Sequence, residues 1–479
     1  MPTRVVALTL VVYLALAGGH AYSGDSVIMV RVTESIATRG AIDVRPIEHF
    51  EDYAVAPGRH GRVYAKYGLA LSVSALPLYA LFAAIEPWVP DEALAAFDGP
   101  KILYYDRTDK PDVIRTFGAV FTNAFVSAAT AGLLAAILVG LGLSPHAAAL
   151  GALVWAFTGV TPYYAKTFFS EPLAGLLLLL AVWAIRRAHV QPSRLYGSVA
   201  LAGLLLGLSI LTRVAHVVLA LPALLALALF LRAHPGLSIA RTLGTAALGF
   251  VGPVAVLLAY NALRFGNPFE TGYGDEAGAF SGNPAVGMAG LLVSPGRGLL
   301  WYFPWAVLSM AGLRALHRSD AAVAVLTGGS AATLLALYSS WHMWEGGWCY
   351  GPRFLVPVLP LLAVPAALAA NDAWPRWRGA VVGLAALSGS LALQSVRIND
   401  VDYTYVLYRT LPDWQEAVRW SWEASPLIGY WHFPLTDALI WPRLLAFEGG
   451  ALLAAFAWLI LLLIPATLWW LASPLRRSS

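Results

Sequence analysis

The chain has 479 residues, of which 59% are hydrophobic and only 12% are charged. This composition excludes a soluble globular protein and indicates a membrane protein. The single cysteine, Cys349, excludes an intramolecular disulfide, and the scattered arginines behind the net charge of +4 do not form a nucleic-acid-binding patch.

A run of about 20 mostly apolar residues is long enough to cross a bilayer. Twelve runs meet this criterion, near 4–20, 114–140, 147–163, 171–185, 196–212, 215–231, 243–262, 298–313, 321–340, 354–371, 379–395 and 450–471. The stretch 67–85 is predicted to lie in the outer interface or to re-enter the membrane. The run at 4–20 ends in small residues, so a cleaved signal peptide is the alternative for it. We predict an all-α polytopic membrane protein with about 12 transmembrane helices, interfacial helices in the first outer loop, and one domain over 1–479.

Short basic loops decide the predicted orientation. Arg186, Arg187 and Arg194 form one such loop, and others lie at 232–241, 314–318, 376–378 and 476–477. Arginine-rich short loops stay in the cytoplasm, so both termini are predicted inside. The long loops 21–113, 263–297 and 396–449 are then all outside, and we expect the functional site on that side.

Polar side chains gather at the predicted outer membrane edge, whereas the middles of the spans carry almost no charge. The absence of charge at midplane argues against a proton-coupled transporter. The residues at or near the outer edge are Asp25, Glu34, His60, Arg62, Tyr64, Lys66, Lys166, Glu171, Arg213, Arg297, Glu345 and Arg353.

Asp25 stands in the stretch AYSGDSVIMVRVTESIATRG, which predicts an amphipathic helix lying on the membrane, with apolar residues at i, i+4 and i+8. One interpretation places Asp25 at the N-cap of this helix. The other makes it a general base for a hydroxyl nucleophile. Glu34, about two and a half turns further on, lies on a different face and is expected to be a solvated helix residue.

Three further stretches carry candidate residues. GRHGRVYAKYGLALSVSALPLY places His60, Arg62, Tyr64 and Lys66 ahead of the interfacial stretch, where the lysine and arginine either snorkel to lipid head groups or hold the phosphate of a lipid carrier. YYAKTFFSEPLAGLLLL places Lys166 and Glu171 at a helix start. WHMWEGGWCYGPRFLVPVLP places Arg353 at the mouth of an apolar helix, where an anion is the expected ligand. No zinc, phosphate-loop or dinucleotide motif occurs.

These motifs in order, together with RFGNPFETGY and SPGRGLLWYFP, resemble the glycosyltransferase C superfamily. Within it, the chain resembles the relatives of protein O-mannosyltransferases and aminoarabinose lipid A transferases, above all bacterial members with YSGD and GPR(F/Y)L motifs. The resemblance covers residues 1–370. Residues 371–479, with the outer loop 396–449, are a variable C-terminal part.

The resemblance implies residue roles. A catalytic Asp follows the first helix in that superfamily, which implies Asp25, and an acidic residue of the second outer loop implies Glu171. A lysine that contacts the donor phosphate implies Lys66, although a Tyr-Gly pair follows where the family has two prolines. The second carboxylate that often adjoins the Asp is Ser26 here. The need for a divalent metal therefore stays open, and no other cofactor is implied.

The resemblance also implies a reaction. The donor is a polyprenyl-phosphate sugar, a hexose or a pentose, and the acceptor is a hydroxyl of a glycan, lipid or protein. Asp25 takes the hydroxyl proton, and transfer inverts the anomeric centre. Lys66 and Arg353, with Arg213, stabilise the phosphate. The expected location is the bacterial inner (plasma) membrane, with the active site facing outward.

Two other hypotheses stay open at this point. A lipid-linked-sugar transporter or flippase predicts polar lining at the midplane and inverted repeats, and the sequence shows neither. A non-catalytic membrane assembly protein predicts a shallow outer surface with no cavity near Asp25.

Overall fold

The computed structural model describes residues 1–44, 54–97 and 109–434. This part of the chain is almost entirely helical, which confirms the predicted all-α class. The predicted run at 450–471 and the end of the loop 396–449 lie outside the described residues. Seven described helices are long and apolar enough to cross a membrane, and three shorter apolar helices accompany them. The total of 12 spans and their orientation remain predictions.

The elements follow one another along the chain as a nearly unbroken series of helices. The two strands are β1 (Val55–Pro57) and β2 (Val63–Ala65), which pair antiparallel with Val55 opposite Ala65. The α-helices are α1 (Pro2–Leu16), α2 (Gly24–Arg39), α3 (Ala70–Ser74), α4 (Leu76–Ile85), α5 (Leu94–Phe97), α6 (Lys110–Val120), α7 (Thr122–Gly140), α8 (Pro145–Phe157), α9 (Thr161–Lys166), α10 (Glu171–Val190), α11 (Leu195–Thr212), α12 (Ala220–Ala233), α13 (Ile239–Phe265), α14 (Pro284–Val293), α15 (Leu299–Tyr302), α16 (Ala306–Ser319), α17 (Ala321–Ser339), α18 (Leu359–Arg397), α19 (Asp400–Thr410), α20 (Trp414–Trp420) and α21 (Pro426–His432).

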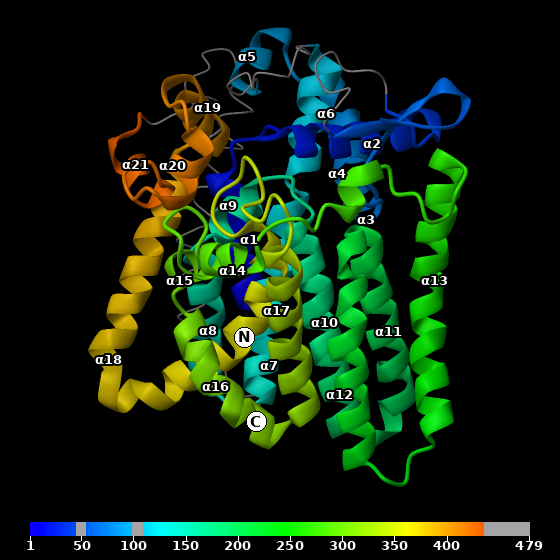
Figure 1. Ribbon diagram of the computed structural model, residues 1–479, viewed down its shortest axis with the longest axis vertical. Helices are drawn as coiled ribbons and strands as arrows, with labels where there is room; N and C mark the ends of the chain where they lie inside the picture. Colours follow the sequence, from blue (N-terminus) through cyan, green and yellow to red (C-terminus); the bar gives the residue numbers. More distant parts are fainter. Residues whose placement is uncertain (45–53, 98–108, 435–479) are drawn as a thin grey trace.

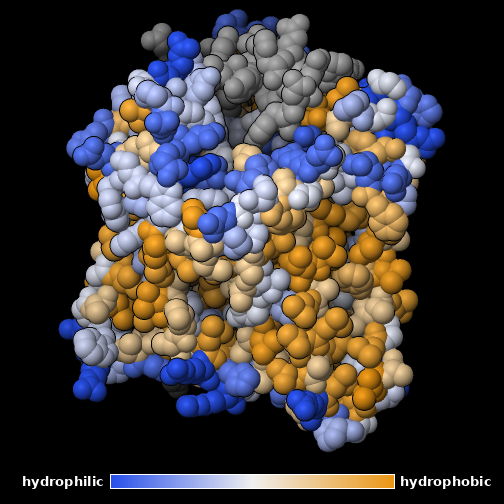
Figure 2. Space-filling model, viewed as in Figure 1, coloured by the Kyte–Doolittle hydropathy of each residue, from blue (hydrophilic) through white to orange (hydrophobic). Residues whose placement is uncertain are grey.

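The described helices form two layers. A bundle of long helices, including α7, α10–α13 and α16–α18, occupies the lower part of Figure 1, and α2, α5, α6 and α19–α21 cover its upper end. Figure 2 shows a broad apolar band over the bundle, between a polar upper cap and a polar lower rim. A band of this kind is the expected surface of a protein whose central part is embedded in a lipid bilayer.

Three predicted runs differ in detail from the structure. The runs 354–371 and 379–395 are the two arms of α18, which bends at Trp377, where φ is −124° and ψ is 26°. The bend lies at the lower left of Figure 1. The run 298–313 is split into α15 and α16, because Pro304 cannot donate the backbone hydrogen bond that would join them.

Helix α2 is more deeply buried than an interfacial helix would be. Nearly all residues from Asp25 to Ser35 are buried, since α3, α4 and α6 pack against α2. Thr33 Oγ1 donates to the carbonyl of Ser72 at 2.9 Å, and Ser72 Oγ donates back to the carbonyl of Met29 at 2.8 Å. Helices α3, α4 and α6 therefore cover α2 with protein, and the prediction that α2 lies on the membrane surface is wrong in this respect.

Candidate active site

Arg353 links two carboxylates that are far apart in the sequence. Its guanidinium NH2 donates to Asp25 Oδ2 at 2.5 Å, and its Nε donates to Glu171 Oε1 at 2.7 Å. All three side chains are less than a tenth exposed. A buried arginine between two carboxylates is held in one orientation, because each ion pair offsets part of the cost of desolvating the charges.

Asp25 and Glu171 each lie in the first turn of a helix. Asp25 lies in the first turn of α2, and the N-cap is Ser23, whose side chain accepts a hydrogen bond from the backbone of Ser26. The N-cap interpretation of Asp25 is therefore wrong, and its carboxylate is free to point at Arg353. Glu171 is the first residue of α10, where a carboxylate is favoured by the helix dipole.

The loop before Arg353 depends on glycine. Gly346 and Gly351 have φ values of +83° and +65°, which other residues rarely adopt. A side chain at Gly346 would also lie 3.1 Å from the Cβ of Arg353. The paired glycines of the Trp-rich stretch thus permit the tight turns that bring Arg353 against the other elements.

Arg213 is the second cation on Glu171. Its NH1 lies 2.5 Å from Glu171 Oε1 and 3.2 Å from Ser170 Oγ, and its NH2 lies 3.5 Å from Tyr338 Oη. Glu171 is fully buried and does not line the adjoining cavity. From this position Glu171 can fix Arg213 and Arg353 in place, but it cannot contact a substrate in the cavity.

Asp25 is held at both oxygens. Tyr67 donates from its hydroxyl to Asp25 Oδ1 at 2.6 Å, while Arg353 occupies Oδ2. Tyr67 belongs to the Tyr-Gly pair that follows Lys66. The sequence prediction did not include Tyr67, although its place beside the candidate lysine was a signal.

A cavity of about 340 Å³ lies against this group. Its ionisable lining includes Asp25, Glu276 and four cations, so the formal charge is four minus two, or +2. Aromatic and apolar side chains form much of the remaining wall. The four cations are Lys66, Arg213, Arg264 and Arg353. A positive cavity with a fixed carboxylate is suited to an anionic ligand and to a proton transfer beside it.

Glu276 and Tyr273 come from the loop between α13 and α14. Glu276 Oε2 lies 3.4 Å from Lys66 Nζ, and the ring of Tyr273 lies 6.0 Å from the same nitrogen. Burial raises the pKa of Tyr273 to about 12, so its hydroxyl is protonated at neutral pH. The lysine that the resemblance assigns to the donor phosphate thus meets a carboxylate of this loop.

Arg264, which the sequence prediction did not include, supports the position of Lys66. It donates to the carbonyl oxygen of Ala65 and, at 2.6 Å, to Asn261 Oδ1, and it is 2% exposed. The available signal was its position in the RFGNPFETGY motif.

Four predicted residues between α1 and α3 lie away from the cavity. Glu34 forms an ion pair with Arg31 at 2.8 Å. His60 and Arg62 are exposed on the turn between the two strands, with His60 at φ +60°. Tyr64 is buried in β2. None of the four is among the residues that line the cavity.

Three predicted residues of later loops also bind elsewhere. Lys166 donates to a backbone carbonyl at the end of α18 at 3.0 Å. Arg297 donates to the carbonyl oxygens of Glu345 and Gly347 at 3.0 and 3.1 Å. The Glu345 carboxylate pairs with Arg419. The contacts of Arg297 and Glu345 hold the Trp-rich loop that leads to Arg353, and none of the three residues lines the cavity.

The described residues include no group of three His, Cys, Asp or Glu side chains that could hold a metal ion. Near Asp25, both carboxylate oxygens already accept hydrogen bonds, and Ser26 stands where a second carboxylate would adjoin it.

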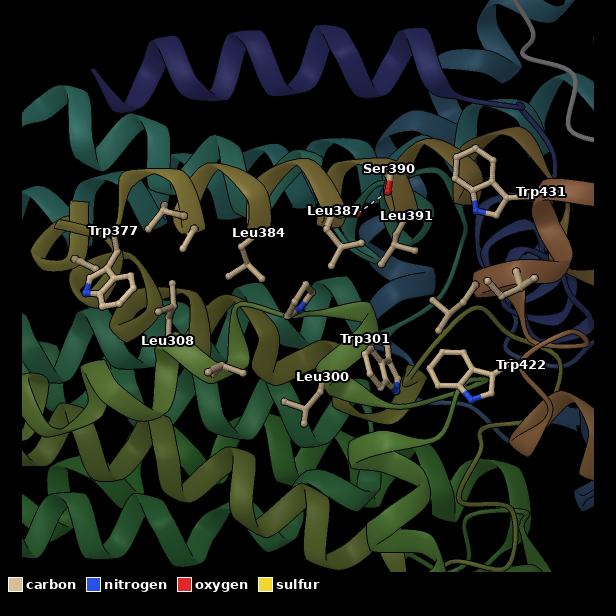
Figure 3. A pocket seen from close by; sticks show the side chains of 17 residues that line it. Leu300, Trp301, Leu308, Trp377, Leu384, Leu387, Ser390, Leu391, Trp422 and Trp431 are labelled. Atoms are coloured by element: carbon tan, nitrogen blue, oxygen red, sulfur yellow. Dashed lines mark hydrogen bonds between the residues drawn. The ribbon is translucent and has the colours of Figure 1, made fainter. Parts of the chain in front are cut away.

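A larger cavity of about 850 Å³ lies between α16 and the second arm of α18. The described residues that line it include no ionisable side chain, and its one hydroxyl, on Ser390, donates to the carbonyl of Leu387. Figure 3 shows Trp301, Trp422 and Trp431 toward one end and Trp377 at the other. This cavity offers hydrocarbon contact but no group for acid–base chemistry.

Comparisons with known proteins identify the fold. No protein-family model matches the chain, and no curated protein matches it. The crystal structure of ArnT from Cupriavidus metallidurans bound to undecaprenyl phosphate matches with a TM-score of 0.51 and 14% identity, over 98% of this chain and 77% of that one. The apo structure of ArnT also has a TM-score of 0.51, over 92% of this chain and 75% of that one.

A more distant match is the oligosaccharyltransferase AglB from Archaeoglobus fulgidus in complex with an inhibitory peptide and a dolichol-phosphate. Its TM-score is 0.42 at 13% identity, over 91% of this chain and 60% of that one, which is too low to add to the comparison. The chain shares the fold of the two ArnT structures.

Proposed function

We propose that the protein transfers a sugar from a polyprenyl-phosphate donor to a hydroxyl acceptor. The observation that carries this proposal is the positive cavity at which Asp25 is fixed by Arg353 and Tyr67. A phosphate ester needs cations at its leaving group, and a hydroxyl nucleophile needs a base. The cavity offers both, because Asp25 and Arg353 form an ion pair in its wall and Lys66 and Arg213 line it beside them. It also weighs against the assembly-protein hypothesis, which expects no cavity near Asp25.

The reaction forms a bond between the acceptor oxygen and the anomeric carbon and breaks the bond from that carbon to the phosphate oxygen. Asp25 accepts the hydroxyl proton, and the polyprenyl phosphate leaves with the bonding electron pair. Attack from the face opposite the leaving group inverts the anomeric centre. A positioned base of this kind contributes about 10²- to 10⁴-fold to the rate.

The cations divide the work on the phosphate. Lys66 and Arg213 line the cavity, and Arg353 connects it to the base, so that the three can stabilise the charge that develops on the leaving group. Glu171 holds Arg213 and Arg353 from behind. Glu276 pairs with Lys66 when no phosphate is bound, and the donor phosphate then takes the place of Glu276 beside Lys66.

A lipid-linked donor suits the surroundings of the cavity. The cavity is formed near the junction of the helical bundle and the cap, and the bundle carries the broad apolar band of Figure 2. An isoprenoid tail can stay in the bilayer while its phosphate reaches the cations. The ArnT structure that shares this fold is bound to undecaprenyl phosphate, which supports a donor of the same class here.

The proposal includes the cellular setting. The single domain lies in a bacterial inner membrane with about 12 spans and both termini inside, because the short arginine-rich stretches at 186–194, 232–241, 314–318 and 376–378 lie at the end of the bundle opposite the cavity (Figure 1). The cavity then faces the outer side, and the acceptor is a glycan, lipid or protein of the cell envelope.

A transfer assay tests the proposal. Purified protein is given polyprenyl-phosphate hexoses and pentoses, and release of polyprenyl phosphate is followed with cell-envelope acceptors. We expect Asp25→Asn to lower the rate at least 100-fold while binding of polyprenyl phosphate is retained. Lys66→Gln is expected to weaken that binding. Glu34→Gln is the matched control, because Glu34 pairs with Arg31 outside the cavity.

Two outcomes would reject the assignments. A folded Asp25→Asn variant with the original rate would remove the base, and phosphate binding indifferent to Lys66→Gln would remove the phosphate site. Mass spectrometry of envelope glycans from cells with and without the protein identifies the sugar and the acceptor.

A further inference from the structure

A second positive cavity lies at the opposite end of α10 from the candidate active site. Helix α10 begins at Glu171 and ends at Val190, so its 20 residues separate the two sites by about 30 Å. This cavity has a volume of about 340 Å³. It is lined by the last turns of α7 and α10 and by the start of the following connection, namely Ala136, Ile137, Gly140, Trp183, Arg186, Arg187, Val190, Gln191 and Arg194.

Arg186 is fixed in the wall of this cavity. Its NH2 donates to the carbonyl oxygen of Gly140 at 2.8 Å, and its NH1 lies 3.4 Å from Asp320 Oδ2. The carbonyl belongs to the C-terminal end of α7, where backbone oxygens lack partners within the helix. Arg186 therefore joins α7, α10 and α17 and shapes the cavity, with its charge partly balanced by Asp320.

Arg187 and Arg194 supply the positive charge of this cavity that Asp320 does not balance. The guanidinium of Arg187 lies 5.1 Å from the ring centre of Trp183, which holds it at the cavity, and Arg194 is exposed at the end of the next short helix. Within the described part of the chain, neither has a carboxylate partner. Two unpaired guanidinium groups beside one cavity are a strong site for a phosphate oxygen.

The rest of the lining is apolar. Ala136 and Ile137 of α7 and Trp183 and Val190 of α10 stand beside the arginines, and the side chain of Val190 is more than half exposed. A free phosphate ion would gain nothing from these side chains. A molecule with a phosphate at one end and hydrocarbon at the other would contact both parts of the cavity.

The general tendency of arginine to stay on the cytoplasmic side explains why basic residues occur at this end of the bundle. It does not require a cavity, an anchored Arg186 or a tryptophan under Arg187. Arg314 and Arg318, in the last turns of α16, show the plain case, because both are exposed and neither lines this cavity.

We propose that this cavity binds the head group of an anionic phospholipid, with the phosphodiester between Arg187 and Arg194 and the start of an acyl chain along Ile137 and Trp183. The site lies on the membrane face opposite the candidate active site. It does not depend on the proposed sugar transfer, because none of its residues lines the cavity beside Asp25.

Native mass spectrometry of the full-length protein in detergent tests the site. Dioleoylphosphatidylglycerol is the probe, dioleoylphosphatidylcholine is the zwitterionic control with the same chains, and excess inorganic phosphate is the competitor without a chain. We expect preferential retention of phosphatidylglycerol that inorganic phosphate does not displace. The double variant Arg187→Gln/Arg194→Gln should weaken it by about fivefold for each arginine removed.

Arg314→Gln/Arg318→Gln is the matched control, with two arginines removed from the same end of the bundle. Equal losses in the two double variants would show a general charge effect and overturn the proposal. Unchanged binding in Arg187→Gln/Arg194→Gln, or displacement by inorganic phosphate, would also overturn it. If the double variant is not produced in folded form, Arg187→Gln and Arg194→Gln are tested singly, each with an expected loss of about fivefold.

Discussion

Removing the charge of Arg353 is the most informative perturbation of the candidate site. In Arg353→Gln, Asp25 keeps only the hydrogen bond from Tyr67, while Glu171 keeps Arg213. Breaking a buried ion pair by removing one partner costs about 3–5 kcal/mol, since the other charge stays desolvated. We therefore expect the free energy of unfolding to fall by about this amount.

A double variant separates buried charge from lost packing. In Asp25→Asn/Arg353→Gln the uncompensated carboxylate is gone, so much of the stability lost in Arg353→Gln should return, although transfer activity should not. The two changes are expected to be non-additive, because their side chains are in direct contact. Arg62→Gln is the control, since its side chain is 58% exposed and lies 3.7 Å from its carboxylate partner. It should cost no more than about 1 kcal/mol.

The assay is unfolding of the purified protein by sodium dodecyl sulfate, followed by tryptophan fluorescence, with all variants in the same detergent. The reasoning about the buried ion pairs would be refuted if Arg353→Gln unfolded at the same point as the wild type. It would also be refuted if the double variant were less stable than Arg353→Gln by the full effect of Asp25→Asn alone.

Three further predictions concern the surroundings of the site. Tyr67→Phe removes the hydrogen bond to Asp25, and a bond to a charged group contributes about 1.5–3 kcal/mol. Transfer should therefore fall by about 10- to 150-fold, with polyprenyl-phosphate binding unchanged. A wild-type rate would argue against orientation of the base. In Gly68→Ala the new methyl group would overlap backbone oxygens at the end of α11, so the free energy of unfolding should fall by about 1–3 kcal/mol and the melting temperature should fall with it. Gly197→Ala is the control, because its methyl group would face open space and should leave the melting temperature unchanged. Equal melting temperatures of the two variants would contradict the packing argument. Burial raises the pKa of the Cys349 thiol to about 11, so the reactive thiolate is scarce at neutral pH. Alkylation of Cys349 in the folded protein should therefore be slow at pH 7, faster toward pH 11, and rapid after denaturation. Fast labelling of the folded protein at pH 7 would count against this burial.

Much of the bundle was predictable because the bilayer acts on each segment separately. Hydropathy and length mark an apolar run wherever its neighbours are, so the positions of the long helices agree with the runs in the sequence. The prediction failed where packing intervened. Helix α2 has the pattern of an interfacial helix, but helices from the same loop cover it, and the hydrogen bonds that do so join residues about 40 positions apart.

The chemistry of the candidate residues was also visible in the sequence. Asp25, Lys66 and Arg353 were singled out by residue type, by place at the outer edge and by resemblance, and all three line one cavity. Tyr67 adjoins the candidate lysine and Arg264 lies in the RFGNPFETGY motif, but both were missed because neither place reveals which group the side chain binds. Their importance follows only from the carboxylate and the carbonyl oxygen that they bind.

By itself, the sequence determined that the protein is an all-α membrane protein, where its long apolar segments lie, and which polar residue types stand at their ends. Only the tertiary structure decided that Arg353 binds Asp25, 328 positions away, and that Glu171 is enclosed behind two arginines. The physical reason is range. Burial in lipid is a property of each residue and its neighbours in the chain, whereas the choice of a partner for a buried charge depends on distances of a few ångströms, which the packing of the helices sets.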